Sequence, residues 1–504
     1  MTAAKKITLG VSEESTGAPL GHDTKNPKRD DKVTRMGTAS IPALITEFAI
    51  PAIAGMLVNG AYNIIASIFL GQSMGEIGQA AMTVANPTMV LLIALGMLIG
   101  VGGNALAALR LGEGKRVEAE RILGNTVLLS IIVAVIVAIC ALIPPVLEAL
   151  ITLSSSTDET RAYATSFVRI IAFGFVFQCI GMGVNNFIRT AGAPNRALLT
   201  MVIGAVACII LSYLFIIVLD WGVEGAAFAI LLGQFASCVA VLWYFVVTKN
   251  VPMRLRLKYM KPKFAIMRQI ISLGLASFFI QAGMALVGIV ANHLVVMYGA
   301  TSPLGADDAL ASIGVVQRIA LFTLMPIFGI SIAIQPLLGF NYGAQLISRV
   351  RKSFWYGVAG SVIIGVFMWI IVHVFPEVIA NAFGIANEGA VAFTVFALKM
   401  QLMFLPIIGF QIIGSNYFQA TGQPLKSILL TLSRQIIFLI PLMLVLTEYL
   451  PLLFPQLDHL ESLCVSLPAS DFLAALTTAI FILFEMKRLK KLERGEVKAK
   501  ILSA

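Results

Sequence analysis

The stretch "NNFIRTAGAPNRALL" (Asn185 to Leu199) has a second copy in the chain, "SNYFQATGQPLKSILL" (Ser415 to Leu430). At an offset of 230 residues, Asn186 aligns with Asn416, and the glycine and proline of the first copy align with those of the second. The chain is therefore expected to contain two related halves.

The composition is that of a membrane protein. Hydrophobic residues make up 58% of the 504 residues, charged residues only 12%, and the mean hydropathy is +0.91. Such a balance indicates a polytopic membrane protein. A membrane-spanning helix needs about 20 apolar residues. By this criterion twelve spans are expected, at residues 41–70, 80–109, 122–143, 162–188, 197–219, 223–247, 265–297, 309–341, 353–375, 390–418, 427–447 and 466–486.

The predicted fold class is an all-α polytopic membrane protein with twelve transmembrane helices in two six-helix lobes related by pseudo-symmetry. An even number of spans in each half gives both halves the same orientation. Secondary transporters with parallel repeats are built in this way, with the substrate site between the halves near the membrane midplane. The predicted segments are a flexible cytoplasmic tail (1–40), an N-terminal lobe (41–248), a basic cytoplasmic linker (249–264), a C-terminal lobe (265–486) and a basic cytoplasmic tail (487–504).

The basic residues are distributed unevenly over the predicted loops. Of the 36 Lys and Arg residues, 31 fall in alternate loops and the terminal segments, whereas the other loops hold one, Arg161. Because Lys and Arg concentrate in short cytoplasmic loops, both termini are expected in the cytoplasm, with the protein in the plasma (inner) membrane. This distribution also accounts for the net charge of +10, so nothing points to a nucleic-acid partner.

The remaining composition gives little support to enzyme or metal chemistry. The five cysteines lie scattered in apolar segments without a CxxC spacing, and the four histidines are far apart in the sequence. Buried free thiols are expected rather than disulfides or metal ligands. No cofactor and no metal are expected.

Several segments carry a family resemblance. They are "YNIIASIFLGQSMGEIGQAA", "FIRTAGAP", "WGVEGAAFA", "MPIFGISIAIQPLLGFNYGA", "GSNYFQATGQP" and "LSRQIIFLIPL", which together span nearly all of residues 41 to 486. With these motifs the chain resembles the multidrug and toxic compound extrusion (MATE) family, in the bacterial branch with the QPxxxFNYGA and FQAxG elements. The resemblance implies an exporter that expels organic, often cationic, compounds in exchange for H+ or Na+.

The chain departs from the family pattern at the positions that would bind the coupling cation. The acid of the family's "YNxxDxxFxG" element falls on Ala66, and the "NxxxD" pair of the fifth span falls on Cys208 and Ser212. A cation site without an anionic ligand lacks its main Coulomb attraction and its titratable group. The coupling site of the first half is therefore expected to be disabled. Glu47 is the one acid assigned to the interior of a span.

Polar residues inside predicted spans are candidates for function because burying them in lipid is costly. His293 of the seventh span is the candidate for ion coupling, since histidine titrates near neutral pH. The more common interpretation of a lone histidine is a hydrogen-bonded packing residue. The candidates for the substrate cleft are Tyr62, Asn63, Asn86, Asn104, Asn185, Asn186, Gln281, Gln317, Arg318, Gln335, Gln411, Asn416, Arg434 and Gln435.

Two of these candidates are paired by the repeat. At an offset of 231, Asn104 aligns with Gln335, and Gly112 aligns with Gly343. Gln335 begins the segment "QPLLGFNYGA", whose proline and glycines favour a bend and close helix packing. Gln335 is thus expected either to face a cleft opposite Asn104 or to belong to a packed crossing. For Arg318 and Arg434 the alternatives are a cleft-lining role and a buried strut between helices.

The leading functional hypothesis is a MATE-like secondary transporter that exports a small-molecule substrate by alternating access. Its expected partners are that substrate, H+ or Na+ as coupling ion, and membrane lipids. A flippase for a lipid-linked or amphiphilic precursor is the main alternative, because such a protein dispenses with strict cation coupling. An intramembrane enzyme has less support, since no HExxH motif and no paired acids are found at helical spacing.

Overall fold

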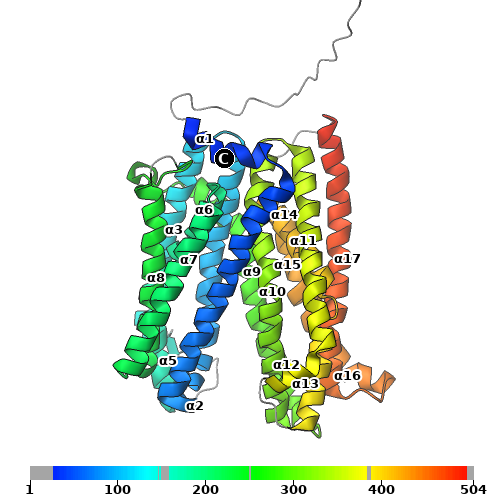
Figure 1. Cartoon of the computed structure of the whole chain (residues 1–504). Coiled ribbons are helices and arrows are strands. Elements are labelled where there is room, and N and C mark those ends of the chain that lie inside the picture. Colours follow the sequence, from blue (N-terminus) through cyan, green and yellow to red (C-terminus); the bar gives the residue numbers. More distant parts are fainter. Residues whose placement is uncertain (1–26, 146, 149–157, 249–250, 383–386, 497–504) are drawn as a thin grey trace, which may run out of the picture.

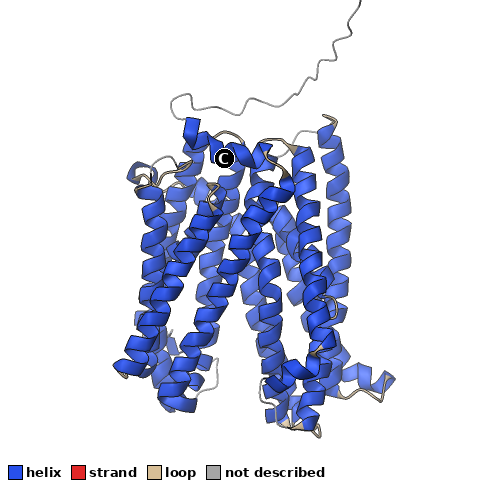
Figure 2. Cartoon of the chain, in the orientation of Figure 1, coloured by secondary structure: helices blue, strands red, loops and turns tan. Residues whose placement is uncertain are grey.

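The computed structural model describes residues 27–145, 147–148, 158–248, 251–382 and 387–496. Every regular element within these ranges is helical (Figure 2). The predicted all-α class is confirmed.

The first half of the chain forms seven α-helical segments and two π-helical segments within the described residues. They are α1 (Pro27–Thr38), α2 (Ile41–Gly112), α3 (Arg116–Leu142), α5 (Asp158–Gln178), η1 (Cys179–Val184), α6 (Asn185–Thr190), α7 (Pro194–Ser212), η2 (Tyr213–Val218) and α8 (Gly222–Val246). A short 3-10 turn, η3 (Leu257–Tyr259), lies in the connection to the second half.

The second half repeats the pattern. Its described elements are α9 (Phe264–Gly299), α10 (Ala306–Gly343), α11 (Ile347–Val374), α12 (Pro376–Ala382), α13 (Glu388–Gln401), α14 (Leu405–Ala420), α15 (Pro424–Leu432), η4 (Ser433–Leu439), α16 (Ile440–Leu453) and α17 (His459–Glu493). The third π-helical segment, η4, thus interrupts the eleventh predicted span.

Eleven helices in the described ranges are long and apolar enough to cross a membrane, or twelve if a bent pair counts as one span. The first two spans, Ile41–Met74 and Val84–Gly112, both belong to α2. The bent pair is α13 with α14, which meet at 44° and replace the straight helix predicted at 390–418. Pro406 at the start of α14 lacks the N–H that would continue the helical hydrogen bonds.

The two halves lie side by side, converge at the end that carries α1, and diverge at the other end (Figure 1). We call these the α1 end and the open end. One buried apolar cluster contains residues of α1 and of both halves, among them Met36, Phe187 and Phe340. The two other clusters each stay within one half, and their members run from Leu70 to Ile230 and from Leu294 to Cys464. The core is therefore shared at the α1 end and divided toward the open end.

The repeat explains how the two halves meet at the α1 end. A Cβ atom placed on Gly112 would lie 2.0 Å from the carbonyl oxygen of Phe340, and one on Gly343 would lie 2.1 Å from that of Leu109. The contact is reciprocal, since both pairs are related by the 231-residue offset. Only glycine lets the backbones of α2 and α10 approach so closely.

Two sequence expectations need correction. Residues 27–38 of the predicted flexible tail form α1. Asn341 Nδ2 of α10 donates to the carbonyl oxygen of Met36 at 3.1 Å, and Arg349 Nη2 of α11 donates to that of Ala39, just after α1, at 2.6 Å. Residues 1–26 lie outside the described part. Glu47 is also not the one acid within a span, because Asp471 lies inside the membrane-spanning helix α17.

We expect Gly343→Val to destabilise the α1 end, because the new side chain would collide with the backbone of α2. The cost should be roughly 1–3 kcal/mol, measured as a lower midpoint of thermal unfolding in detergent. Gly314→Val is the matched control on the same helix, since nothing lies within 4 Å of a Cβ atom at Gly314. Equal midpoints for the two variants would contradict the close crossing.

Candidate functional site

A chain of side-chain hydrogen bonds connects the two halves where α2 crosses α10. Thr190 Oγ1 donates to Asn104 Oδ1 at 2.6 Å, and Asn104 Nδ2 donates to Gln335 Oε1 at 3.0 Å. Gln335 Nε2 then donates to Asn416 Oδ1 at 3.0 Å and to Gln419 Oε1 at 3.3 Å. The repeat partners Asn104 and Gln335 therefore face each other, within a buried helix crossing and not across an open cleft.

The chain continues into the second half. Gln419 Nε2 donates to the carbonyl oxygen of Leu273 at 2.7 Å and to Ser277 Oγ at 3.0 Å, both on α9. Asn416 Nδ2 donates to Ser331 Oγ of α10 at 2.9 Å. Spans from both halves thus share one polar network, which we call the inter-half network: Asn104, Thr190, Ser277, Ser331, Gln335, Asn416 and Gln419.

Burial makes the hydrogen bonds of this network important for stability. Asn104 and Gln335 are 1% and 3% exposed, so no water replaces a lost partner in this conformation. Leaving a buried polar group without a partner costs about 1–3 kcal/mol. The inter-half network therefore fixes how α2 lies on α10 and holds the α1 end closed.

A second polar site lies within the second half, between η4 and α17. Arg434 Nε donates to Asp471 Oδ1 at 2.8 Å, and the two side chains are 22% and 8% exposed. Ser470 Oγ also donates to the carbonyl oxygen of Arg434 at 2.8 Å. This geometry agrees with the strut interpretation of Arg434 and supplies the carboxylate partner that sequence reasoning overlooked.

Asn185 and Asn186 bind the buried guanidinium of Arg189. Their Oδ1 atoms accept hydrogen bonds from Arg189 Nη1 at 2.9 and 2.6 Å, and Arg189 is 4% exposed. Asn185 Nδ2 donates to Thr200 Oγ1 at 2.6 Å. In this conformation Asn185 connects α6 to α7 within the first half, and Asn186 binds Arg189 on α6.

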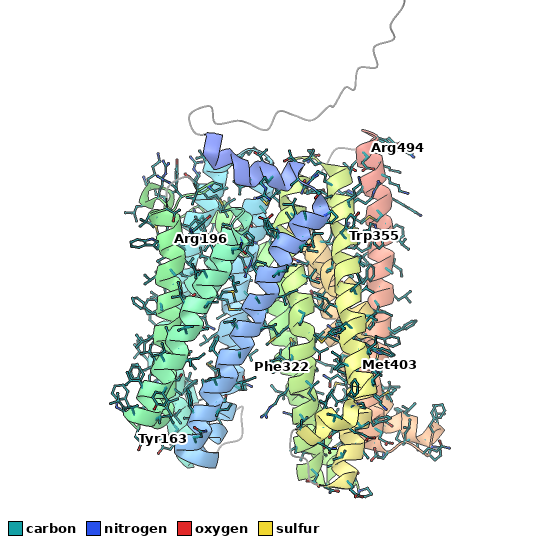
Figure 3. All side chains as sticks on the ribbon, viewed as in Figure 1. Tyr163, Arg196, Phe322, Trp355, Met403 and Arg494 are labelled. Atoms are coloured by element: carbon teal, nitrogen blue, oxygen red, sulfur yellow. The ribbon has the colours of Figure 1, made fainter. Side chains whose placement is uncertain are left out.

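The other candidates are dispersed. Asn86, Gln317, Arg318 and His293 are exposed, Tyr62, Gln281 and Gln435 are half-buried, and Gln411 is buried. The side chain of Asn63 lies outside the described part. Phe322, on the exposed face of α10 that also carries Gln317 and Arg318, lies on the side facing α2 (Figure 3).

The positions that correspond to the family's cation ligands are packed and apolar or weakly polar. Ala66, Cys208 and Ser212 are each at most 2% exposed, and Cys208 Sγ lies 4.0 Å from Ser212 Oγ. Gly55 lies beside Met201, with 2.8 Å between its Cβ position and the sulfur atom. The helices α2 and α7 run in the same direction from the α1 end. Ala66 follows Gly55 by eleven residues and Ser212 follows Met201 by eleven residues, so Ala66 and Ser212 lie at a similar level.

A cavity of about 400 Å³ lies elsewhere, near the open end of the first half. Arg161, Arg169 and Glu148 contribute to its lining. It touches neither the inter-half network nor the Arg434–Asp471 pair, and we assign no transport role to it.

The family model MatE matches residues 51–214 and 270–445. The chain belongs to the MatE family. The two matched segments fall in the two halves and include all seven residues of the inter-half network. MATE proteins are membrane transporters that export drugs, not enzymes.

Individual relatives agree with this assignment. The chain is 23% identical over 459 residues to the multidrug export protein MepA of Staphylococcus haemolyticus (strain JCSC1435). The alignment covers 91% of this chain and 97% of the relative. Its fold is similar to a solved "outward-facing conformation of a multidrug resistance MATE family transporter of the MOP superfamily", with a TM-score of 0.82, 23% identity, and coverage of 91% and 98% of the two chains. It is similar to the same extent to a MOP superfamily transporter from Pyrococcus furiosus Vc1 for which "reverse polarity of binding pocket suggests different function", with a TM-score of 0.82, 24% identity, and coverage of 91% and 98%.

Sequence reasoning missed several participants in these sites, among them Thr190, Ser277, Ser331 and Gln419 of the inter-half network, and Asp471. Gln419 occupies the repeat position of Arg189, and an uncharged amide at that position in the second copy was a usable signal. Thr190 could not be selected, because a threonine hydroxyl can donate to a carbonyl of its own helix and so gives no distinct signal of a contact between helices. Asp471 could have been found as an acid inside the last predicted span, 466–486.

We expect Gln335→Leu to lower stability, because it leaves Asn104 Nδ2, Asn416 Oδ1 and Gln419 Oε1 without their shared partner. Each unpaired group should cost about 1–3 kcal/mol, read as a lower midpoint of thermal unfolding. Gln281→Leu, at a half-buried position outside the network, is the control.

A double-mutant cycle between Asn104→Leu and Gln335→Leu separates their mutual hydrogen bond from other effects. A coupling energy of about 0.5–3 kcal/mol is expected for side chains in contact. Additive losses would mean that the two amides do not interact.

Proposed function

We propose that this protein is a MATE-type secondary active transporter that exports organic compounds, including cationic ones, by alternating access coupled to H+ or Na+ antiport. The α1 end is the cytoplasmic end, and the open end faces outward. The protein lies in the plasma (inner) membrane with both termini in the cytoplasm. Its partners are the small-molecule substrate, the coupling ion and the surrounding lipids.

The observation that carries this proposal is the contrast between the two ends. At the α1 end, the halves share a core, cross at Gly112 and Gly343, and share the inter-half network. Toward the open end, each half has its own core. Two bodies with separate cores, joined by a limited polar contact, can rock about that contact and expose a central site to each side in turn.

The relatives support the cargo class. MepA is named a multidrug export protein, and the similar solved structure is of a multidrug resistance transporter. The residues proposed to meet substrate are the exposed polar candidates Asn86, Gln317 and Arg318 together with half-buried Tyr62 and Gln281. Asn104, Gln335 and Asn416 would become accessible when the α1 end opens.

The coupling ion is proposed to act in the second half. Ala66, Cys208 and Ser212 offer no carboxylate in the first half, and all three are buried. The second half has His293, exposed on α9, and Asp471, buried against Arg434. Either group can change its charge by taking up a proton, whereas Arg318 and Arg434 keep theirs.

A flippase for an amphiphilic precursor is the second candidate. The same replaced positions favour it, because a flippase can operate without the cation site of the first half. The Pyrococcus furiosus relative, whose pocket polarity is described as reversed, also belongs to the MOP superfamily.

Inverted membrane vesicles containing the protein should accumulate an organic cation when a proton or a sodium gradient is imposed, whereas vesicles without it should not. Accumulation that depends on either gradient supports export. Transbilayer movement of a lipid-linked precursor without any dependence on these gradients would favour the flippase instead.

Wild-type transport should not be stimulated by sodium through the first half. The double variant Ala66→Asp plus Ser212→Asp adds two carboxylates at a similar level on adjacent helices. Their mutual repulsion favours binding of a proton or a cation, so this variant should gain pH or sodium dependence that the wild type lacks. Strict sodium dependence of the wild type that survives His293→Ala would contradict a disabled first-half site.

A further inference from the structure

Asp471 is a carboxylate deep within a membrane-spanning helix. It lies 12 positions after His459, the first residue of α17, which is about 18 Å along the helix at 1.5 Å per residue. It is 6% exposed as a residue, and Leu463, Ala474 and Thr478 on the same helix are also buried. Asp471 therefore faces the interior of the second half.

Arg434 meets Asp471 from a π-helical segment. Single π-turns within α-helices often mark functional sites, because they displace side chains and free backbone groups. Arg434 is the second residue of η4, and its carbonyl oxygen accepts a hydrogen bond from Ser470 Oγ. The neighbouring residues Ser470 and Asp471 thus hold both the backbone and the guanidinium of Arg434.

Two unused acceptors lie at the same level. Gln411 Oε1 and Gln435 Oε1 are buried and have no hydrogen-bond partner among the described residues. Ser415 Oγ lies 2.9 Å from Thr431 Oγ1. Since α14 and the α15–η4 segment are antiparallel, one helical turn toward the open end leads from Ser415 to Gln411 and from Thr431 to Gln435.

The pair is isolated from other charges. Within the described part of the chain, Arg434 is the one hydrogen-bond and ion-pair partner of Asp471. The other titratable or charged side chains on α17 and on the elements packed against it do not reach Asp471; they include His293, Tyr298, Arg349, Arg351, Lys352, Tyr356, His373, Lys399, Tyr417, Lys426, Glu448, Tyr449, His459, Glu461 and Glu485. The charge of this site is therefore set by Asp471 and Arg434 alone.

We propose that Asp471 and Arg434 form the proton-binding site that drives transport, in a polar interior that also contains the unpaired oxygens of Gln411 and Gln435. This inference rests on the proposed export function and assigns its coupling ion. A proton from water binds a carboxylate oxygen of Asp471, and the charge-assisted hydrogen bond from Arg434 is lost. The guanidinium keeps its own protons and its positive charge.

Proton binding changes the net charge of the site from zero to plus one. In an apolar interior, a second cation near this site is then disfavoured by Coulomb repulsion. A cationic substrate and the proton therefore bind in alternation, which is the requirement for antiport. In this proposal the Asp471–Arg434 pair binds the coupling ion, which Ala66, Cys208 and Ser212 cannot do because they carry no carboxylate.

Infrared difference spectra of the full-length protein in lipid nanodiscs, between alkaline and acidic buffer, test the site without transport. We expect a carboxylic-acid C=O band that Asp471→Asn removes and that Asp471→Glu restores at a shifted frequency. Glu485→Gln, at the other buried carboxylate of α17 (1% exposed), should leave the band in place. Arg434→Met should make the band appear at higher pH, because the cation that favours the ionised carboxylate is gone.

A band that persists in Asp471→Asn, or none in the wild type, would overturn the proposal. Proteoliposomes with an imposed pH gradient distinguish this failure from that of the export function. If Asp471→Asn still accumulates substrate under a proton gradient, Asp471 has no coupling role, but the export function stands. If the wild type shows the Asp471 band but accumulates no substrate under any gradient, the proton-binding site is supported and the export function is refuted.

Discussion

The hydrogen bond between Asn104 and Gln335 is the contact on which the described conformation depends. In a membrane interior a polar side chain has no water to turn to, so it must find a partner within the protein. The two amides come from equivalent positions of the two halves and are brought together by the reciprocal glycines Gly112 and Gly343. Polar pairing and close backbone packing therefore act at one place, and they close the α1 end.

The same requirement organises the rest of the polar interior. Gln419 bridges to Ser277, Asn185 and Asn186 hold Arg189, and Arg434 holds Asp471. These contacts differ in what they can do. Amides and hydroxyls exchange hydrogen-bond partners when helices move, whereas a buried carboxylate also responds to protons. The polar interior thus contains a structural network shared by both halves and, in the second half, a buried carboxylate paired with an arginine.

The pseudo-symmetry is kept in the backbone and broken in the chemistry. The turns at Gly192 and Gly422 have φ values of 75° and 77°, and α2 crosses α10 reciprocally. In contrast, Arg434 has Gly204 at its repeat position, and Arg189 has Gln419. The repeated scaffold thus gives two halves with a similar backbone, while the unlike side chains place the Arg434–Asp471 pair in one of them.

The sequence by itself determined the all-α class, the number of spans to within one bent pair, and the alignment of Asn104 with Gln335 in the repeat. Those features follow from hydropathy, the lengths of apolar runs and a repeat, which are all local or periodic. Only the tertiary structure decided that Gln335 lies buried in a network rather than in an open cleft, that α1 docks on α10, and that Asp471 meets Arg434. Such contacts join residues that are distant in the chain, or whose side chains are redirected by a π-helical segment. They depend on helix rotation and close packing, which hydropathy does not encode.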